Sequence, residues 1–467
     1  MFKHLFKSLK PKASLGEIRA LLALAQQRQK AGEPRAAIAA YRKALEAGAP
    51  AAEAHLQLGA LHAGLSEYDA AVEELNRSIE LRPDNADALC MLGTVMSDLR
   101  RFDDAARLFE RSLALKPDLS EGHFNLGLAH FERARFDDAA ASFAHCVELN
   151  RGAPWDAARR ADLSHEPLPR FTPKDMAVNT IKLRHDCEQL EYLLQLGRLP
   201  DRYRPVLDDY RALFRELGDI DIETVVPFDA ARHRLVAATY KRPFHIAEVS
   251  APAEPIINPQ LDFRGIEQRY LGAEPNAIFV DSLLTPPALE ALRRFCLEST
   301  IWNAIKPGYL GAYFYDGFCS PLLLRLAWEL REAFPAVFRG QPLQTMWGYK
   351  CDCSLPGLAV HADAAAVNVN FWITDDSANL DPQSGGLLVY PQQAPEDWGF
   401  AKYNHDPGPI LRYLESTGGE PIRVPYRANR AVIFDSDLFH ATDRPRFRGG
   451  YLNRRINITL LYGLRLA

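Results

Sequence analysis

The chain has 467 residues, 47% hydrophobic and 25% charged, which is the composition of a folded protein too long for one core, so two or three domains are expected. A formal net charge of −5 argues against a nucleic-acid-binding protein, which usually carries a basic face. No apolar run reaches the roughly 20 residues of a membrane-spanning helix, so no membrane span is predicted.

Residues 1–153 are predicted to form an array of helical repeats. Several residue types recur every 34 positions: Gly59, Gly93 and Gly127; Ala71, Ala105 and Ala139; Tyr68, Phe102 and Phe136; and Pro83 and Pro117. Each unit has two amphipathic helices, as at residues 52–63 and 68–81, with small residues where the helices cross and a proline after the second. The pattern resembles the tetratricopeptide repeat, which forms an all-α solenoid.

A less regular copy of this repeat runs from Ile18 to Pro50, with Ala25 at the glycine position. Stacked helix pairs of this type form a concave surface that suits an extended peptide or a partner protein. The array is therefore predicted to recruit a protein or peptide. The alternative is that it serves packing or the formation of a homo-oligomer.

Residues 154–255 are predicted to form a mainly helical connector. A polar stretch with prolines, at residues 165–169, is followed by apolar residues at helical spacing over residues 180–217. The spacing breaks between Gly197 and Pro200, which predicts a helical hairpin.

Residues 256–467 carry β-strand patterns. Residues 277–281 are predicted as a strand and residues 286–300 and 321–334 as helices, and several short strands follow, separated by turn residues. Helices that lead into a run of strands, without alternating with them, favour a closed β-sandwich with external helices over a doubly wound sheet.

Three residues of this region have the composition of a metal site. Two imidazoles, His361 and His440, and one carboxylate, Asp363, would fill one face of an octahedral metal and leave its other positions open, as in the facial triad of non-haem Fe(II) oxygenases. A zinc hydrolase could use the same ligand types, and a non-enzymatic β-sandwich could hold such residues by hydrogen bonds alone. Asp435 and Asp437 are alternative carboxylates, although both are expected to shape the turn before His440.

The last predicted strand adds a positive charge. Alternation over residues 455–462 places Arg455 and Thr459 on one face, opposite an apolar face that would pack under the helices. Arg455 would then point inward and Arg454 outward. A planar guanidinium can hold a carboxylate by two parallel hydrogen bonds, and Thr459 adds a hydroxyl. Alternation over residues 367–373 likewise places Asn370 on a polar face that could line a pocket.

Residues from about 277 to the end resemble the 2-oxoglutarate and Fe(II)-dependent oxygenases, in particular the prolyl-hydroxylase-like branch. The matching pieces are His361, Asp363, Gly385-Gly386-Leu387, Ile433-Phe434-Asp435 before His440, and residues 455–459. The resemblance implies a double-stranded β-helix, or jelly roll, with Fe(II) held by His361, Asp363 and His440. It also implies 2-oxoglutarate bound through Arg455, with Tyr349 where such enzymes often place a tyrosine near the co-substrate.

The same resemblance implies a reaction. Oxidative decarboxylation of 2-oxoglutarate by O2, giving succinate and CO2, is coupled to hydroxylation of a substrate, with ascorbate as a reductant. The combination of repeats with this domain also resembles collagen-type prolyl hydroxylases, so the expected substrate is a protein or peptide residue recruited by the repeats. The alternatives are oxidation of a small metabolite, with the repeats used for oligomerisation or partner docking, and a non-catalytic binding scaffold.

Seven cysteines are scattered along the chain and odd in number. This usage fits reduced thiols better than a disulfide framework and predicts a cytoplasmic protein.

Overall fold

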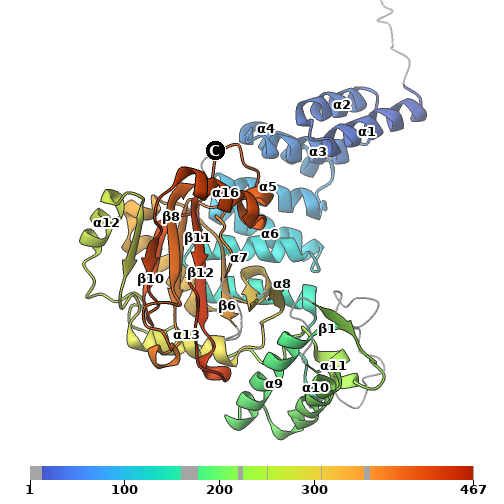
Figure 1. The fold of residues 1–467 in the computed structure, drawn as a ribbon. Helices are drawn as coiled ribbons and strands as arrows, with labels where there is room; N and C mark the ends of the chain where they lie inside the picture. The colour runs from blue at the N-terminus through green and yellow to red at the C-terminus, as the bar shows by residue number, and fades with distance from the viewer. Residues whose placement is uncertain are drawn as a thin grey trace, which may run out of the picture. The chain divides into compact units, whose positions relative to one another are not determined.

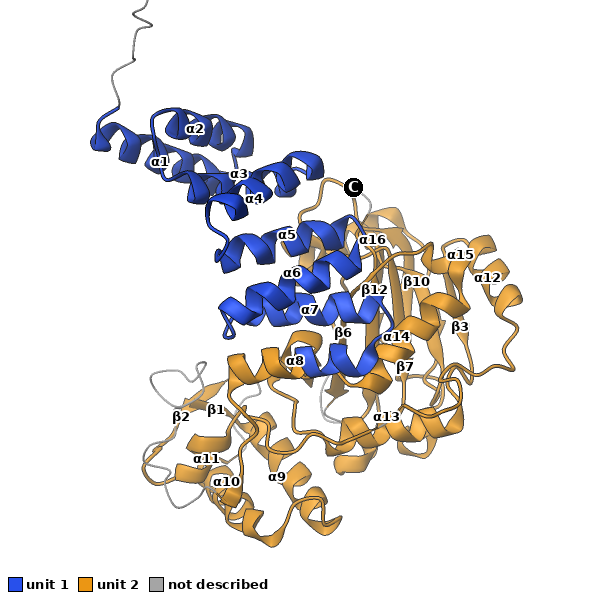
Figure 2. Cartoon of the chain, turned by 180° about the vertical axis from the view of Figure 1, so that it is seen from behind, with its two compact units in different colours: residues 1–142 blue, residues 143–467 orange. Residues whose placement is uncertain are grey.

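The computed structural model describes residues 13–158, 177–218, 224–249, 251–306, 308–351 and 358–465. They fall into two compact units, Met1–Ser142 and Phe143–Ala467 (Figure 2). Helix α8 (Phe136–Arg151) crosses the boundary. The domain limits predicted at residues 153 and 255 stay predictions, and the polar stretch at residues 165–169 lies outside the described residues.

The first unit consists of paired helices in chain order (Figure 1). They are α1 (Leu15–Lys30), α2 (Pro34–Glu46), α3 (Ala51–Gly64), α4 (Tyr68–Leu81), α5 (Ala86–Asp98), α6 (Phe102–Leu115), α7 (Ser120–Glu132) and the first part of α8. The predicted all-helical solenoid is therefore confirmed, including the less regular first copy.

The recurring small residues lie where the two helices of a repeat touch. A Cβ atom added to Gly93 would lie 2.7 Å from the Phe109 ring, and Ala71 and Ala105 are fully buried. Ala25, at the glycine position of the first copy, is also fully buried. The 34-residue period thus records one packing constraint repeated along the chain.

We expect Gly93→Ala to destabilise the repeats by about 1–3 kcal/mol, because the added methyl group overpacks the contact with Phe109. Gly64→Ala is the matched control, since it also lies in a helix but a Cβ there meets nothing within 4 Å. That change should be neutral or stabilising by up to about 1 kcal/mol. Urea unfolding followed by helical circular dichroism measures both. Equal effects of the two changes would contradict the packing role of Gly93.

The second unit begins with a helical part. Helices α9 (Thr180–Gln195) and α10 (Arg204–Leu217) form the predicted hairpin, followed by α11 (Arg234–Thr239). A two-stranded sheet of β1 (Ala177–Asn179) and β2 (Val225–Pro227) joins them. Fully buried side chains such as Leu190, Leu193 and Tyr210 form their common core.

The rest of the second unit contains two antiparallel sheets. The seven-stranded sheet has the order β3 (Ala277–Val280), β10 (Ala431–Asp435), β7 (Val367–Trp372), β12 (Ile456–Tyr462), β6 (Leu343–Cys351), β5 (Tyr309–Tyr313) and β4 (Ala304–Lys306). The three-stranded sheet has the order β11 (Leu438–Thr442), β8 (Leu387–Gln393) and β9 (Ile422–Val424). The helices are α12 (Phe263–Gly272), α13 (Pro286–Glu298), α14 (Pro321–Ala333), α15 (Pro335–Phe338), α16 (Pro407–Thr417) and a π-helical turn, Ala401–His405.

The two sheets pack face to face, with helices outside. Trp372 and Phe434 of the larger sheet share one buried cluster with Val389 and Leu438 of the smaller sheet. Helices α13 and α14 lie over the outer face of the larger sheet (Figure 2), where the Tyr462 hydroxyl donates to the backbone of α14. The predicted strands and external helices are present, while the assignment as a double-stranded β-helix stays a prediction.

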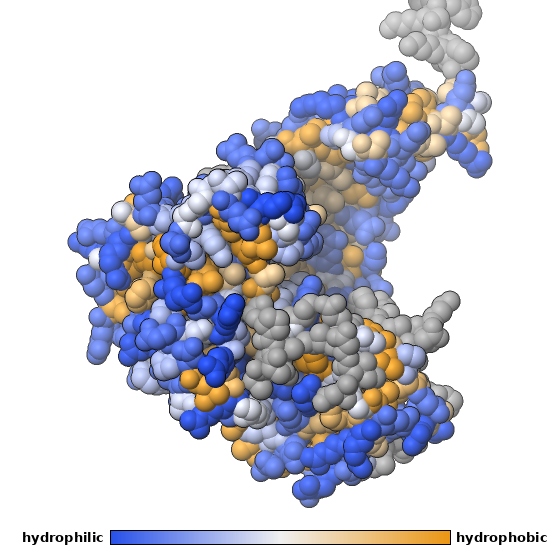
Figure 3. Space-filling model, in the orientation of Figure 1, coloured by the Kyte–Doolittle hydropathy of each residue, from blue (hydrophilic) through white to orange (hydrophobic). Residues whose placement is uncertain are grey.

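The molecular surface is mixed in character. On the face drawn in Figure 3, apolar residues form small patches between polar ones, as on many protein surfaces. None of the helices in the described ranges combines the length and the apolar character that a membrane crossing requires.

Candidate metal centre

The backbone brings the two predicted histidine ligands together. His361 and His440 form an antiparallel bridge at the edge of the smaller sheet. The His361 N–H donates to the His440 carbonyl at 3.0 Å, and the His440 N–H donates to the His361 carbonyl at 2.8 Å. Their rings lie side by side, with centroids 4.3 Å apart.

Each imidazole is oriented by a backbone carbonyl. His361 Nδ1 lies 2.8 Å from the Ala359 oxygen, and His440 Nδ1 lies 3.1 Å from the Leu438 oxygen. Because a carbonyl only accepts, each Nδ1 carries the proton and each Nε2 presents a lone pair. Burial, followed by the neighbouring His440, lowers the pKa of His361, which favours the neutral ring that a metal needs.

Asp363 completes the cluster. Its two carboxylate oxygens lie 3.9 Å from His361 Nε2 and 3.5 Å from His440 Nε2. The Asn368 amide donates to the carboxylate at 2.8 Å. Burial acts to raise the pKa of this carboxyl, but the adjacent rings of His440 and His361 and the hydrogen bond from Asn368 hold it below its usual value.

These three residues have the geometry of a site for one metal ion. The candidate ligand atoms of His361, Asp363 and His440 all lie within 4.8 Å of one another. The alternative carboxylates are engaged elsewhere: Asp435 accepts a hydrogen bond from the Tyr270 hydroxyl at 2.6 Å, and Asp437 pairs with Arg465. Two neutral imidazoles and one carboxylate form the donor set of a facial triad.

A chain of buried amides leads from Asp363 into the space between the sheets. Asn368 accepts a hydrogen bond from the Asn370 amide at 2.6 Å. Asn370 accepts in turn from Thr459 at 2.7 Å and from Asn457 at 2.8 Å. Asn370 and Thr459 therefore lie on the inward faces of β7 and β12 and are bonded to each other. Thr459 follows Arg455 by four residues.

Arg455 is buried between the sheets, with only 2% of its surface exposed. Its Nε donates to the Gly385 carbonyl at 2.7 Å and its Nη2 to the Gly386 carbonyl at 3.3 Å. Its Nη1 meets the Cys351 sulfur at 3.7 Å, and within the described ranges no carboxylate pairs with this guanidinium. Arg454 points the other way and pairs with Glu188 of α9 at 2.9 Å.

A cavity of about 440 Å³ opens beside the triad. Tyr349, His361 and Asp363 line it, whereas the residues that line it do not include His440, Asn370, Thr459 or Arg455. His405, whose predicted loop could approach a substrate, also lines it, and so do residues that were not predicted for the site, among them Tyr309, Tyr313, Trp347 and Asn404. Strand alternation could have placed Trp347 beside Tyr349, but the sequence carries no signal for Asn404.

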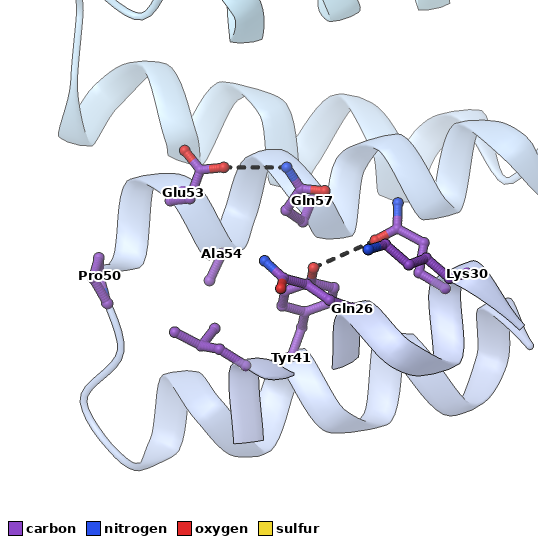
Figure 4. A pocket seen from close by; sticks show the side chains of 9 residues that line it. Gln26, Lys30, Tyr41, Pro50, Glu53, Ala54 and Gln57 are labelled. Carbon is purple, nitrogen blue, oxygen red and sulfur yellow. Dashed lines mark hydrogen bonds between the residues drawn. The ribbon is translucent and has the colours of Figure 1, made fainter. Parts of the chain in front are cut away.

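A second candidate site lies in the repeats, in a groove of about 590 Å³ (Figure 4). Its lining combines polar and apolar side chains and consists of Leu22, Gln26, Gln29, Lys30, Tyr41, Pro50, Glu53, Ala54 and Gln57. Gln57 donates to Glu53 at 3.1 Å, and the Tyr41 hydroxyl donates to Gln29 at 3.4 Å. Carboxamides can both donate to and accept from a peptide backbone.

Comparisons with known proteins concern the repeats. Family models described as tetratricopeptide repeat match residues 50–118 and 90–154. No curated protein matches the chain. Solved structures similar to part of the chain include MamA, 29% identical over 28% of this chain and 77% of that chain, with a TM-score of 0.27.

Two further structures are similar at the same low overall level. One is YrrB, titled a TPR protein with an unusual peptide-binding site, 26% identical over 28% of this chain and 67% of that chain, with a TM-score of 0.26. The other is the first TPR of Spaghetti (RPAP3) bound to an HSP90 peptide, 19% identical over 27% of this chain and 99% of that chain, with a TM-score of 0.26. The family-model matches and the observed helix pairs agree: the N-terminal region of this chain consists of tetratricopeptide repeats.

Proposed function

We propose that the chain is a 2-oxoglutarate- and Fe(II)-dependent dioxygenase that hydroxylates a residue of a protein or peptide, recruited by the tetratricopeptide repeats. The observation that carries the proposal is the cluster of His361, Asp363 and His440, whose ligand atoms lie within 4.8 Å of one another. Its two imidazoles are held in the tautomer that leaves Nε2 for a metal.

The buried cation supports the choice of 2-oxoglutarate as co-substrate. A buried charge without a partner is costly, and among the described residues no carboxylate pairs with Arg455, so a bound anion would offset its desolvation. Backbone carbonyls of Gly385 and Gly386 orient its Nε and Nη2. The distal carboxylate of a dicarboxylic acid would supply such a negative charge, which a zinc hydrolase would not require.

The chain's own residues have distinct tasks in this proposal. His361, Asp363 and His440 would hold Fe(II), which together with 2-oxoglutarate and O2 supplies the oxidation. Arg455 orients the co-substrate, while the amide chain through Asn368 and Asn370 keeps the Asp363 carboxylate ionised and fixed. The aromatic side chains that line the cavity would keep water away from the substrate carbon that is hydroxylated.

The proposal is tested by incubating the full chain with Fe(II), ascorbate, O2 and labelled 2-oxoglutarate. A dioxygenase of this class releases labelled CO2 and succinate, and it does so slowly even in the absence of the substrate that it hydroxylates. A non-catalytic scaffold is the second candidate, favoured by the family-model matches, which are confined to the repeats. A scaffold would release no more CO2 than a reaction without protein, whichever peptide is supplied.

Recruitment by the repeats predicts a selective loss on truncation. We expect deletion of residues 1–135 to reduce modification of a polypeptide substrate by about tenfold or more, while release of CO2 without substrate persists. The cut keeps α8, because Phe143 packs on Phe314, with ring centroids 4.5 Å apart, and Arg151 pairs with Asp316.

The readout is mass spectrometry of peptides for added oxygen, with thermal unfolding as the folding control. Unchanged peptide modification by the truncated chain would exclude recruitment. Unchanged turnover of a small metabolite by the same protein would support the metabolite oxidase and leave the repeats for oligomerisation or partner docking.

A further inference from the structure

The turn Ala401–His405, one of the walls of the cavity beside the triad, has an unusual backbone. It is π-helical, a form that is rare and is frequently found at functional sites. Asn404 and His405 of this turn line the cavity, together with the preceding residue Phe400. The turn lies about forty positions after the first two triad residues in the sequence but against them in space.

The turn binds both backbone groups of Ala362, the residue between His361 and Asp363. The Ala362 N–H donates to the Tyr403 carbonyl at 2.9 Å. The Ala362 carbonyl accepts from the Asn404 side-chain amide at 2.7 Å. Ala362 is itself fully buried, so neither backbone group can exchange its partner for water.

The same amide also approaches the carboxylate. Asn404 Nδ2 lies 3.4 Å from Asp363 Oδ1, while Asn368 Nδ2 lies 2.8 Å from Asp363 Oδ2. Each of the two oxygens of Asp363 is thus faced by an amide donor of its own. Rotation of the carboxylate away from the imidazoles would break these contacts.

Arg465, in the C-terminal segment, holds this π-helical turn in place. The Arg465 guanidinium lies over the Tyr403 ring at 4.5 Å and pairs with Asp437. It also donates to the carbonyl of Pro395 at 3.1 Å, on the segment that leads into the turn. Asn404 therefore belongs to a turn whose position is fixed by the contacts of Arg465.

We propose that the π-helical turn Ala401–His405 fixes the His361-Ala362-Asp363 segment for metal binding, and that Asn404 is the positioning residue that acts through Ala362 and Asp363. The inference rests on the proposed metal site. It adds a residue outside the triad whose task is to hold two ligands at the spacing that one ion requires.

The test uses the full-length protein without iron and Co(II) as the probe, followed by its visible absorption. We expect Asn404→Ala and the similarly sized Asn404→Leu to weaken Co(II) binding by about tenfold, the lower end of what loss of a ligand's hydrogen-bond partner costs. The absorption spectrum of bound Co(II) should change as well, because its intensity depends on ligand geometry. A purely structural role would lower the unfolding temperature without altering that spectrum.

Asn453→Ala is the matched control, since Asn453 lies on the surface and donates to Gly449 at 2.7 Å. It should leave affinity and spectrum unchanged. Wild-type affinity and spectrum in both Asn404 variants would overturn the positioning role alone. Failure of the wild-type protein to bind Co(II) would overturn the proposed metal site and this inference with it.

Discussion

Replacement of His361 by alanine is expected to lower release of CO2 from 2-oxoglutarate by more than about a hundredfold. His361 would supply one of the three proposed ligands, and its Nε2 lies 3.9 Å from Asp363. Without it, one imidazole and one carboxylate remain, which is too few to hold Fe(II) against water. The measurement is release of labelled CO2 with Fe(II) and ascorbate, together with the dissociation constant for Mn(II) in the absence of O2.

His145→Ala is a suitable control. His145 is about half exposed, with 48% of its side-chain surface open to solvent, and it lies 3.7 Å from Glu148, distant in sequence from the triad. It should retain full turnover and Mn(II) affinity. Turnover that persists in His361→Ala would show that another set of ligands carries the chemistry and would refute the triad.

Periodic features of the molecule were the predictable ones. The 34-residue spacing of small residues recorded the contact between helices, as at Gly93 and Phe109, because each repeat must solve the same packing problem. Alternation over the predicted strand at residues 455–462 placed Arg455 on the inward face and Arg454 on the outward face, because a strand has a period of two.

Contacts between distant segments were not predictable. The pairing of Asn404 with Ala362 depends on how a π-helical turn docks against the smaller sheet, and no local pattern records that docking. The cavity wall formed by Tyr313 depends on the pairing of β5 with β6, which a single sequence does not determine. The three residues of the triad could be proposed from the sequence, because their residue types indicate a metal site even without their geometry.

Substitutions of the neighbouring arginines Arg454 and Arg455 should separate an effect on 2-oxoglutarate binding from an effect on stability. Arg455→Ala is expected to raise the KM for 2-oxoglutarate by roughly a hundredfold, because loss of charge-assisted hydrogen bonds to a carboxylate costs about 3 kcal/mol. Arg454→Ala removes the same charge from the next position, but this side chain faces Glu188 of α9 at 2.9 Å. It should lower the unfolding temperature and leave KM within about twofold.

A 2-oxo acid without the distal carboxylate, such as pyruvate, makes the comparison sharper. Its binding should be weak in the wild-type protein and unaffected by Arg455→Ala, because pyruvate lacks the carboxylate that Arg455 is proposed to hold. Loss of buried charge at Arg455 could also disturb the sheets, but a packing defect would weaken both acids alike. A larger rise in KM from Arg454→Ala than from Arg455→Ala would contradict the proposed role of Arg455 in holding the co-substrate, since of these two arginines only Arg455 lies between the sheets, where the co-substrate would be held.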